Sequence, residues 1–224
     1  MILKTENLKK SYRQGSEEIK VLQNVNFEVS AGETIAILGK SGSGKSTLLS
    51  LLCGIESANS GDVFYANKGL SSLSEDDLTD LRAKHIGVIF QQFHLIEHLS
   101  AVENIMLPLE ISGHKKPYEE ALEFLKKVGM QHRKSHFPSQ LSGGEKQRIA
   151  IARSLAASPK ILLADEPSGS LDEKTGSEVM KLIFDLVSDT DMSLILVTHD
   201  NQLASKCQKT FHLEDGTLRL ENDL

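Results

Sequence analysis

The sequence predicts an α/β fold built on a mostly parallel β-sheet. Short apolar runs, typical of buried strands, alternate with runs of helical periodicity at both ends of the chain. A helix between successive strands is typical of βαβ units, in which the two strands are parallel. With 224 residues, of which 39% are hydrophobic and 25% charged, the chain is long enough to bury a core as one large domain or two modest ones.

The first predicted elements are strands. Short apolar stretches alternate with turns in residues 2–8 and 19–33, which predicts antiparallel pairing. ETIAILG, residues 33–39, predicts a short buried strand that ends in glycine. A helical run follows at residues 45–55, and a second apolar strand is expected within residues 85–93.

Residues 93–157 are expected to be helical and to form an insertion. The periodicity is good in residues 118–130 and 145–158. No fixed-period repeat or low-complexity linker interrupts the chain. We therefore expect a single domain over residues 1–224.

The last part of the chain returns to strand–helix alternation. Apolar strands are predicted in residues 160–167 and 193–200, with a helix at 175–189 between them. Residues 211–220 contain an Asp-Gly pair between two short apolar runs, which predicts a closing β-hairpin.

Composition excludes several classes of protein. The formal net charge of −6 gives no broad basic face, so we expect no nucleic-acid partner. Cys53 and Cys207 lie far apart and form no CxxC pair, so neither a disulfide framework nor a zinc ribbon is expected. The expected compartment is a reducing cytosol. No apolar run reaches the roughly 20 residues that cross a bilayer. The chain is expected to be soluble, with any membrane part on another polypeptide.

A phosphate-binding loop is predicted between the strand at 33–39 and the helix at 45–55. GKSGSGKST matches G-x-x-x-x-G-K-[ST], and the strand before it and the helix after it are the context that the motif needs. In such a loop the glycines let N–H groups point at a phosphate, Lys45 is a cation for the outer phosphates, and the Ser46 hydroxyl is a ligand for Mg²⁺. The candidate residues are Gly39, Lys40, Ser41, Gly42, Ser43, Gly44, Lys45, Ser46 and Thr47. The alternative is a glycine-rich turn that matches by chance.

KILLADEP supplies a second piece of phosphate chemistry. Asp165 follows four buried apolar residues and is expected at the carboxyl end of a strand, where α/β folds bind ligands, so it can hold Mg²⁺ through water. Glu166 can then accept a proton from an attacking water. The alternative is a surface Asp-Glu pair at the start of a loop. Asn67-Lys68 lacks the aspartate of a guanine-reading motif, which argues against a GTPase.

A second glycine-rich segment, LSGGE, precedes another helical run. A helix start with adjacent glycines also favours an anion. The alternative is a serine that caps the helix, followed by two turn glycines. The LSGGE segment and the loop at Gly39–Thr47 together give the chain two candidate phosphate sites, although it has only one nucleotide-binding fold.

The order GKSGSGKST, Gln91, LSGGE, ILLADEP, Leu171-Asp172, His199 resembles the nucleotide-binding subunit of ABC transporters over nearly the whole chain. FQQFHLI, DEPSGSLD and LILVTHD are most similar to the LolD/MacB type of export ATPase. The resemblance implies a P-loop NTPase (RecA-like) core with an antiparallel β subdomain and an inserted helical subdomain. The core would cover about residues 1–92 and 158–224, and the insertion about 93–157. It also implies an ATPase that uses ATP and Mg²⁺.

The resemblance explains the second glycine-rich segment. In this family two subunits pack head to tail, so Ser142, Gly143 and Gly144 of one copy would close over the γ-phosphate held by Lys45 of the other. A homodimer around two nucleotides is therefore implied. Glu145 stands where many relatives have Gln, and SGS before Leu171 stands where this subfamily more often has TGN; neither change removes a group with an implied role.

Four further positions receive roles from the same resemblance. Tyr12 would stack on adenine; the alternative is a half-buried strand aromatic. Gln91 would touch Mg²⁺ and the attacking water, and we prefer it to Gln92 because it directly follows the strand. Asp172 would link the two sites across the dimer, and His199 would orient the γ-phosphate and Glu166.

The resemblance also implies a partner and a location. We expect an integral membrane permease subunit, which would hold the chain at the inner face of a bacterial cell membrane. Its groove for the permease is expected around Gln91 and FHLIEHLSAVENI. The alternative is an ABC-type ATPase that acts as a soluble assembly scaffold. HLIEH, residues 94–98, matches an inverted zinc-protease motif, but that chemistry requires the motif on a helix with an added carboxylate ligand, and here it lies directly after Gln91, at the expected mobile entry to the helical insertion.

Overall fold

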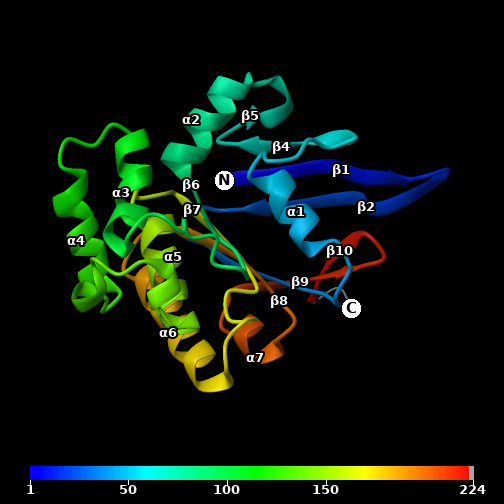
Figure 1. Cartoon of the computed structure of the whole chain (residues 1–224). Helices are drawn as coiled ribbons and strands as arrows, with labels where there is room; N and C mark the ends of the chain where they lie inside the picture. Colours follow the sequence, from blue (N-terminus) through cyan, green and yellow to red (C-terminus); the bar gives the residue numbers. More distant parts are fainter. Residues whose placement is uncertain (222–224) are drawn as a thin grey trace. The chain divides into compact units, whose positions relative to one another are not determined.

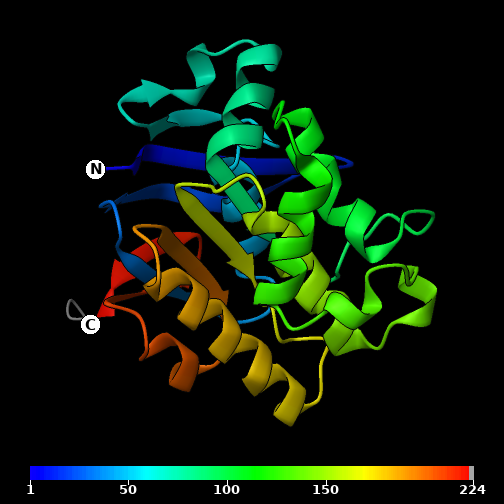
Figure 2. The same cartoon turned by 90° about the vertical axis from the view of Figure 1, so that its left-hand side faces the viewer.

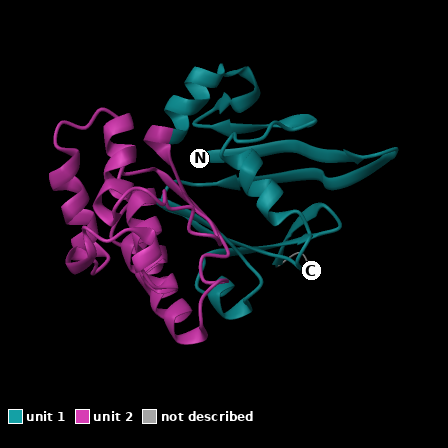
Figure 3. Ribbon diagram, in the orientation of Figure 1, with its two compact units in different colours: residues 1–82, 192–224 teal, residues 83–191 magenta. Residues whose placement is uncertain are grey.

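The computed structural model describes residues 1–221 (Figure 1). The chain forms two compact units: Met1–Arg82 together with the segment from Met192 onward, and Ala83–Asp191 (Figure 3). The segment 93–157, expected to be helical, lies inside the second unit and contains α-helices and 3-10 turns, with no strand among its residues, all of which are described.

An antiparallel sheet forms one layer of the first unit. Its strands are β1 (Leu3–Gln14), β2 (Glu17–Val29), β4 (Ser60–Tyr65) and β5 (Lys68–Gly69), in the order β2-β1-β4-β5. Apolar side chains such as Leu3, Leu8 and Val25 are fully buried on one face. The antiparallel pairing predicted for the first two strands is confirmed.

The other layer of the first unit contains parallel strands. β3 (Thr34–Leu38) pairs in parallel with both β8 (Ser193–Thr198) and β9 (Lys209–Glu214). β10 (Thr217–Leu220) closes the predicted hairpin with β9. Its Asp215-Gly216 turn has φ of 47° and 72°, the positive pair that a tight two-residue hairpin turn requires.

Helices complete the first unit. α1 (Lys45–Leu52) follows β3, and the short α7 (Asn201–Ala204) follows β8. α2 (Glu75–His85) leads from the first unit into the second, and a 3-10 turn, η1 (Leu70–Ser72), precedes it. α2, β4 and β5 are not predicted from the sequence. No residue of α2 is buried, so the helix has no apolar stripe that would reveal its period.

The second unit pairs two parallel strands with four helices (Figure 2). The strands are β6 (Ile86–Ile89) and β7 (Ile161–Asp165), aligned so that Ile89 is opposite Ala164. The helices and turns are α3 (Ala101–Ile111), α4 (Pro117–Lys127), η2 (Gln131–Arg133), η3 (Pro138–Gln140), α5 (Gly143–Leu155) and α6 (Glu173–Ser188). α5 begins two residues before the run predicted from Glu145. No helix among the residues described here has the length and hydrophobicity needed to span a membrane.

Candidate functional site

The phosphate loop of the first unit connects the carboxyl end of β3 to the start of α1. Gly44 caps α1 in a left-handed conformation with φ of 99°, and a Cβ there would lie 2.8 Å from Val21 Cγ1. At Gly39 a Cβ would lie 2.6 Å from Ser43 Oγ and 2.8 Å from the carbonyl oxygen of Leu213. Both positions therefore require glycine, which explains part of the motif by conformation and packing alone.

Lys45 holds this loop in shape. Its ammonium group donates to the carbonyl oxygens of Gly39 at 2.8 Å and Lys40 at 2.9 Å, and the residue is buried. Ser43 Oγ is buried and has no hydrogen-bond partner within residues 1–221. An orphaned hydroxyl and a cation beside a helix N-terminus are donors for an anion, so these residues fit a phosphate group.

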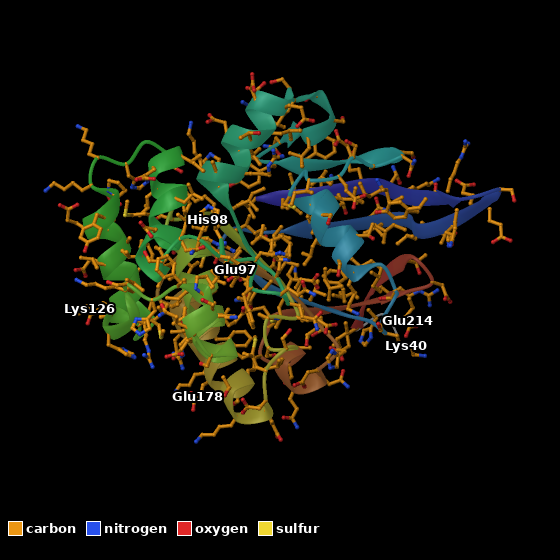
Figure 4. The ribbon with its side chains drawn as sticks, in the orientation of Figure 1. Lys40, Glu97, His98, Lys126, Glu178 and Glu214 are labelled. Atoms are coloured by element: carbon orange, nitrogen blue, oxygen red, sulfur yellow. The ribbon has the colours of Figure 1, made fainter. Side chains whose placement is uncertain are left out.

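A cavity of about 520 Å³ borders the loop. Loop residues Lys40 to Ser43 line one side of it, and the β9–β10 turn from Glu214 to Gly216 lines another (Figure 4 labels Lys40 and Glu214). Ile19 of β2, which also lines this cavity, is paired across the sheet with Tyr12 of β1. The predicted adenine-binding aromatic is thus opposite a residue of the cavity wall.

Tyr12 belongs to a cluster of charged groups. Its hydroxyl donates to Glu56 at 2.6 Å, and Lys10 is 2.9 Å from the same carboxylate and 5.0 Å from the centre of the Tyr12 ring. The Tyr12 hydrogen bond, with Lys10, lowers the pKa of Glu56. Burial and the Glu56 contact raise the pKa of Tyr12, so the phenol stays protonated and remains a donor.

His199 lies next to the phosphate loop in the sheet order. β8 and β3 are paired so that Thr198 is opposite Leu38, and His199 and Gly39 are the next residues of each strand. Asp200 then caps α7 by accepting from the backbone of Gln202 at 2.7 Å. The exposed His199 is therefore held between a strand end and a helix cap, at the sheet edge from which the phosphate loop leaves.

The second unit has its own group of candidate residues at the carboxyl ends of β6 and β7. Asp165 ends β7, as predicted. Glu166 follows with φ of 41°, and its carbonyl oxygen accepts from Gly169 N at 2.9 Å. A positive φ on a non-glycine residue costs about 1–3 kcal/mol and is frequent at functional sites.

Gln91 lies against the turn that follows Glu166. Ser170 Oγ donates to the carbonyl oxygen of Gln91 at 3.0 Å, and a Cβ on Gly169 would be 2.9 Å from Gln91 Nε2. β6 ends at Ile89, so Phe90 separates Gln91 from the strand, one residue more than expected. The structure nevertheless brings Gln91 and the Glu166–Gly169 turn together.

The LSGGE segment is the start of α5. Ser142 is the N-cap: its Oγ accepts from Glu145 N at 3.3 Å, and Glu145 Oε2 accepts from Ser142 N at 2.8 Å. Arg133 Nε donates to the other carboxylate oxygen of Glu145 at 2.8 Å. Glu145 thus completes a capping box, a role that its S-x-x-E spacing could have revealed.

Two predicted site residues have structural roles in the same unit. Gly144 is in close contact with α6, because a Cβ there would collide with Thr175 Cγ2. Asp172 caps α6 by accepting from Thr175 N at 3.1 Å, and the contacts with Thr175 lower its pKa. Helix capping and close packing therefore account for part of the sequence pattern without any ligand.

The segment after Gln91 carries no helix. Residues 94–98 are irregular and His94 has φ of 46°, so the H-x-x-E-H motif lacks the helical geometry of a zinc protease. A hollow of about 350 Å³ adjoins this segment. Its walls are formed by Gln92, Phe93, His94, Leu95, Glu97, Lys146 and Ser170.

The family model described as "ABC transporter" matches residues 22–169. The chain belongs to the ABC transporter ATP-binding family. It is therefore an ATP-hydrolysing cassette, and the resemblance found in its motifs is confirmed.

Two relatives indicate the branch of the family. The cassette is 42% identical to the lipoprotein-releasing system ATP-binding protein LolD of Francisella tularensis subsp. holarctica, over 98% of this chain and 96% of the relative. It is 43% identical to the uncharacterized ABC transporter ATP-binding protein YbbA of Escherichia coli K12, over 98% and 97%. Both are consistent with the LolD/MacB type.

Solved structures confirm the fold class. The ATP-binding cassette MJ0796, solved as a dimer in a post-hydrolysis state bound to ADP and Pi, has a TM-score of 0.91 and 40% identity, with 98% of each chain covered. CbiO1 from Clostridium perfringens, part of the ABC transporter complex CbiONQ, has a TM-score of 0.83 and 31% identity over 98% of this chain and 87% of that one. The cassette therefore has the P-loop NTPase architecture expected from its sequence.

The sequence does not predict the roles of several residues of the cassette, because these roles depend on contacts between distant parts of the chain. Lys10 and Glu56 lie 46 residues apart and meet only in the fold. Gln147 is completely buried and donates to the carbonyl oxygen of Pro167 at 2.6 Å. Its burial could have been read from the period of the helix, but its partner could not.

Proposed function

We propose that two copies of this cassette close around two Mg-ATP molecules and use hydrolysis to drive a membrane-embedded export or extraction partner. The observation that carries the proposal is that the chain has two helix starts suited to an anion, α1 behind the phosphate loop and α5 behind Ser142. One nucleotide per chain needs only one of them. The dimeric form in which MJ0796 was solved, bound to ADP and Pi, supports assigning the second to a neighbouring copy.

In this proposal the first unit holds the nucleotide. Tyr12 stacks on adenine, and the loop from Gly39 to Thr47 surrounds the phosphates with N–H donors. Lys45 exchanges its bonds with the loop carbonyls for bonds with the outer phosphate oxygens. Mg²⁺, when bound, neutralises phosphate charge, and the residues suited to hold it are Ser46, Gln91 and Asp165, all oxygen donors as this ion prefers.

Glu166 is the proposed general base. It accepts a proton from water while the water oxygen bonds to the γ-phosphorus and the bond from that phosphorus to the bridging oxygen of ADP breaks. Lys45 and His199 of the same copy stabilise the charge that spreads over the phosphoryl oxygens, together with Ser142 of the second copy. Asp172, at the start of α6, lies in the segment proposed to connect the two sites of the dimer.

The output of the cycle is proposed to be mechanical. ATP favours the closed pair because each nucleotide contacts both copies, and the pair opens once the γ-phosphate has been cleaved. The hollow beside Gln92–Leu95 is the proposed seat of a cytoplasmic helix of the permease. That partner would place the cassette at the inner face of a bacterial membrane.

The variant Glu166→Gln tests the proposal. It keeps the size of the side chain and removes the base, so the protein should bind ATP, accumulate as a dimer in size-exclusion chromatography and hydrolyse ATP very slowly. Turnover near the wild-type rate would show that Glu166 is not the base. Purification from membranes adds the second test: a copurifying integral membrane protein supports transport, whereas a soluble assembly complex would contradict it and favour a scaffold role.

A further inference from the structure

Gln147 belongs to α5, the helix that begins in the LSGGE segment and is called the signature helix below, and it is bonded to the residue that follows the proposed base. Its Nε2 donates to the carbonyl oxygen of Pro167 at 2.6 Å, and both residues are buried. The two residues are 20 positions apart and belong to the same unit. This bond therefore ties α5 to the loop after β7, one residue beyond Glu166.

The orientation of the Gln147 amide is fixed by its partner. A proline carbonyl can only accept, so the amide nitrogen must face Pro167 and the amide oxygen must point elsewhere. That oxygen, Oε1, is buried and has no hydrogen-bond partner in the part of the chain that the structure describes. An unsatisfied buried acceptor is unfavourable for folding, so an apolar side chain would suit this position better if packing were its only purpose.

The backbone on the other side of this bond is unusual. Glu166 has φ of 41°, outside the common regions for a non-glycine residue, and Pro167 disfavours the right-handed helical conformation of the residue before it. Two hydrogen bonds surround the strained residue: Gly169 N donates to the carbonyl of Glu166 at 2.9 Å, and Gln147 holds the carbonyl of Pro167. A backbone in such a conformation persists only where its surroundings fix it.

We infer that Gln147 is a positioning residue for Glu166: its hydrogen bond to Pro167 fixes the backbone from which the base reaches the attacking water. The inference rests on the proposed role of Glu166. It goes further by giving the signature helix a second task, because Gln147 lies five residues after Ser142 on α5. Each chain would then connect the segment that covers a neighbour's nucleotide to the base that serves its own.

The test uses the purified full-length cassette with Gln147→Met, which keeps the length of the side chain and removes the donor. We expect kcat to fall by about tenfold to a hundredfold, the usual cost of a slightly misplaced catalytic group, while KM for ATP stays nearly constant because the phosphate loop is untouched. Ser154→Ala is the matched control on the same helix. Its hydroxyl donates only within α5, to the carbonyl of Ile151 at 2.8 Å, and kcat should not change.

A double-mutant cycle separates positioning from general damage to the fold. In a Glu166→Gln background the base is already absent, so adding Gln147→Met should change the residual single-turnover rate by no more than about twofold. The same large loss in both backgrounds would overturn the inference, as would a single Gln147→Met protein with wild-type kcat. If Gln147→Met does not fold, Gln147→Asn retains a buried amide that is too short to reach Pro167, and it must show the same loss.

The two proposals fail in different ways. Rapid hydrolysis by Glu166→Gln alone would remove the base assignment, and the inference about Gln147 with it. Slow hydrolysis by Glu166→Gln combined with normal hydrolysis by Gln147→Met would remove only the positioning role.

Discussion

The hydroxyl of Tyr12 donates a 2.6 Å hydrogen bond to the carboxylate of Glu56, a residue in the loop that follows α1. Lys10 pairs with the same carboxylate at 2.9 Å, and its ammonium group also donates to the carbonyl of Ser57 at 2.8 Å. The helix that begins at the phosphate loop is therefore connected, through the loop at its far end, to the aromatic ring expected to stack on adenine. The ring is held in place before any base arrives.

This relationship predicts that Tyr12→Phe and Glu56→Gln weaken ATP binding without slowing chemistry. Tyr12→Phe removes one hydrogen bond, worth about 1 kcal/mol, and Glu56→Gln weakens the same bond and removes the charge that pairs with Lys10. KM should therefore rise by at least about fivefold while kcat is retained. Tyr12→Ala removes the stacking ring itself and should weaken binding further, by about 1–3 kcal/mol. Calorimetric titration with ATP provides the measurement. Unchanged affinity in Tyr12→Ala would mean that adenine binds elsewhere.

A second prediction concerns stability in acid. The backbone N–H of Ser142, aided by Arg133, holds the pKa of Glu145 below its ordinary value. A carboxyl with a lowered folded-state pKa stabilises the fold above its unfolded pKa of about 4.3, and this contribution is lost as pH falls through the lower folded value. Glu145→Gln keeps the acceptor geometry but does not titrate.

We therefore expect the melting temperature of the wild type to decline more steeply than that of Glu145→Gln as pH is lowered from about 5. At neutral pH the variant should melt about 2–4 °C lower, the shift for a loss of about 1 kcal/mol in a chain of this size. The measurement is the melting temperature of the wild type and of Glu145→Gln at a series of pH values. Equal slopes for the two proteins would show that the negative charge of Glu145 adds no stability to the capping box.

A third prediction separates packing from ligand binding at Gly144. A Cβ at this position collides with Thr175 Cγ2, so Gly144→Ala should destabilise the cassette by about 1–3 kcal/mol through overpacking. Thr175→Ser deletes that methyl group. The double variant should recover most of the lost stability in thermal melts, and failure to recover would place the cause outside this contact.

The same two substitutions, Gly144→Ala and Thr175→Ser, also test the proposed ligand role of the LSGGE segment. If Gly144 also approaches a nucleotide held by a second copy, the double variant should be stable and yet show weakened ATP-dependent dimerisation. Wild-type dimerisation by a stable double variant would assign Gly144 to packing alone.

The sequence predicted those parts of the cassette whose cause is local. The phosphate loop follows from a glycine pattern between a strand and a helix, and the position of Asp165 follows from the buried run before it. α2 is not predicted, because none of its residues is fully buried and its period therefore leaves no apolar trace. Glu56 and Gln147 were missed because their partners, Tyr12 and Pro167, are distant in the chain, and nothing local to either residue marks such a contact.

Two motif residues of the second unit have structural roles in addition to their proposed ligand roles. Gly144 and Asp172 fit the family pattern, and the structure gives each a local reason to be glycine or aspartate. Packing or helix capping can therefore require a residue type at a motif position that is also proposed to contact a ligand. Only a measurement that separates stability from activity can assign the ligand role.

The proposed cycle requires a site that a second copy of the chain completes, and the concentration dependence of hydrolysis tests this most directly. ATPase rate per molecule should be measured across a dilution series, with sedimentation at each concentration to report the fraction of dimer. We predict that the specific rate falls on dilution in proportion to the loss of dimer and approaches zero for the monomer. A constant specific rate at concentrations where the cassette is entirely monomeric would contradict the account.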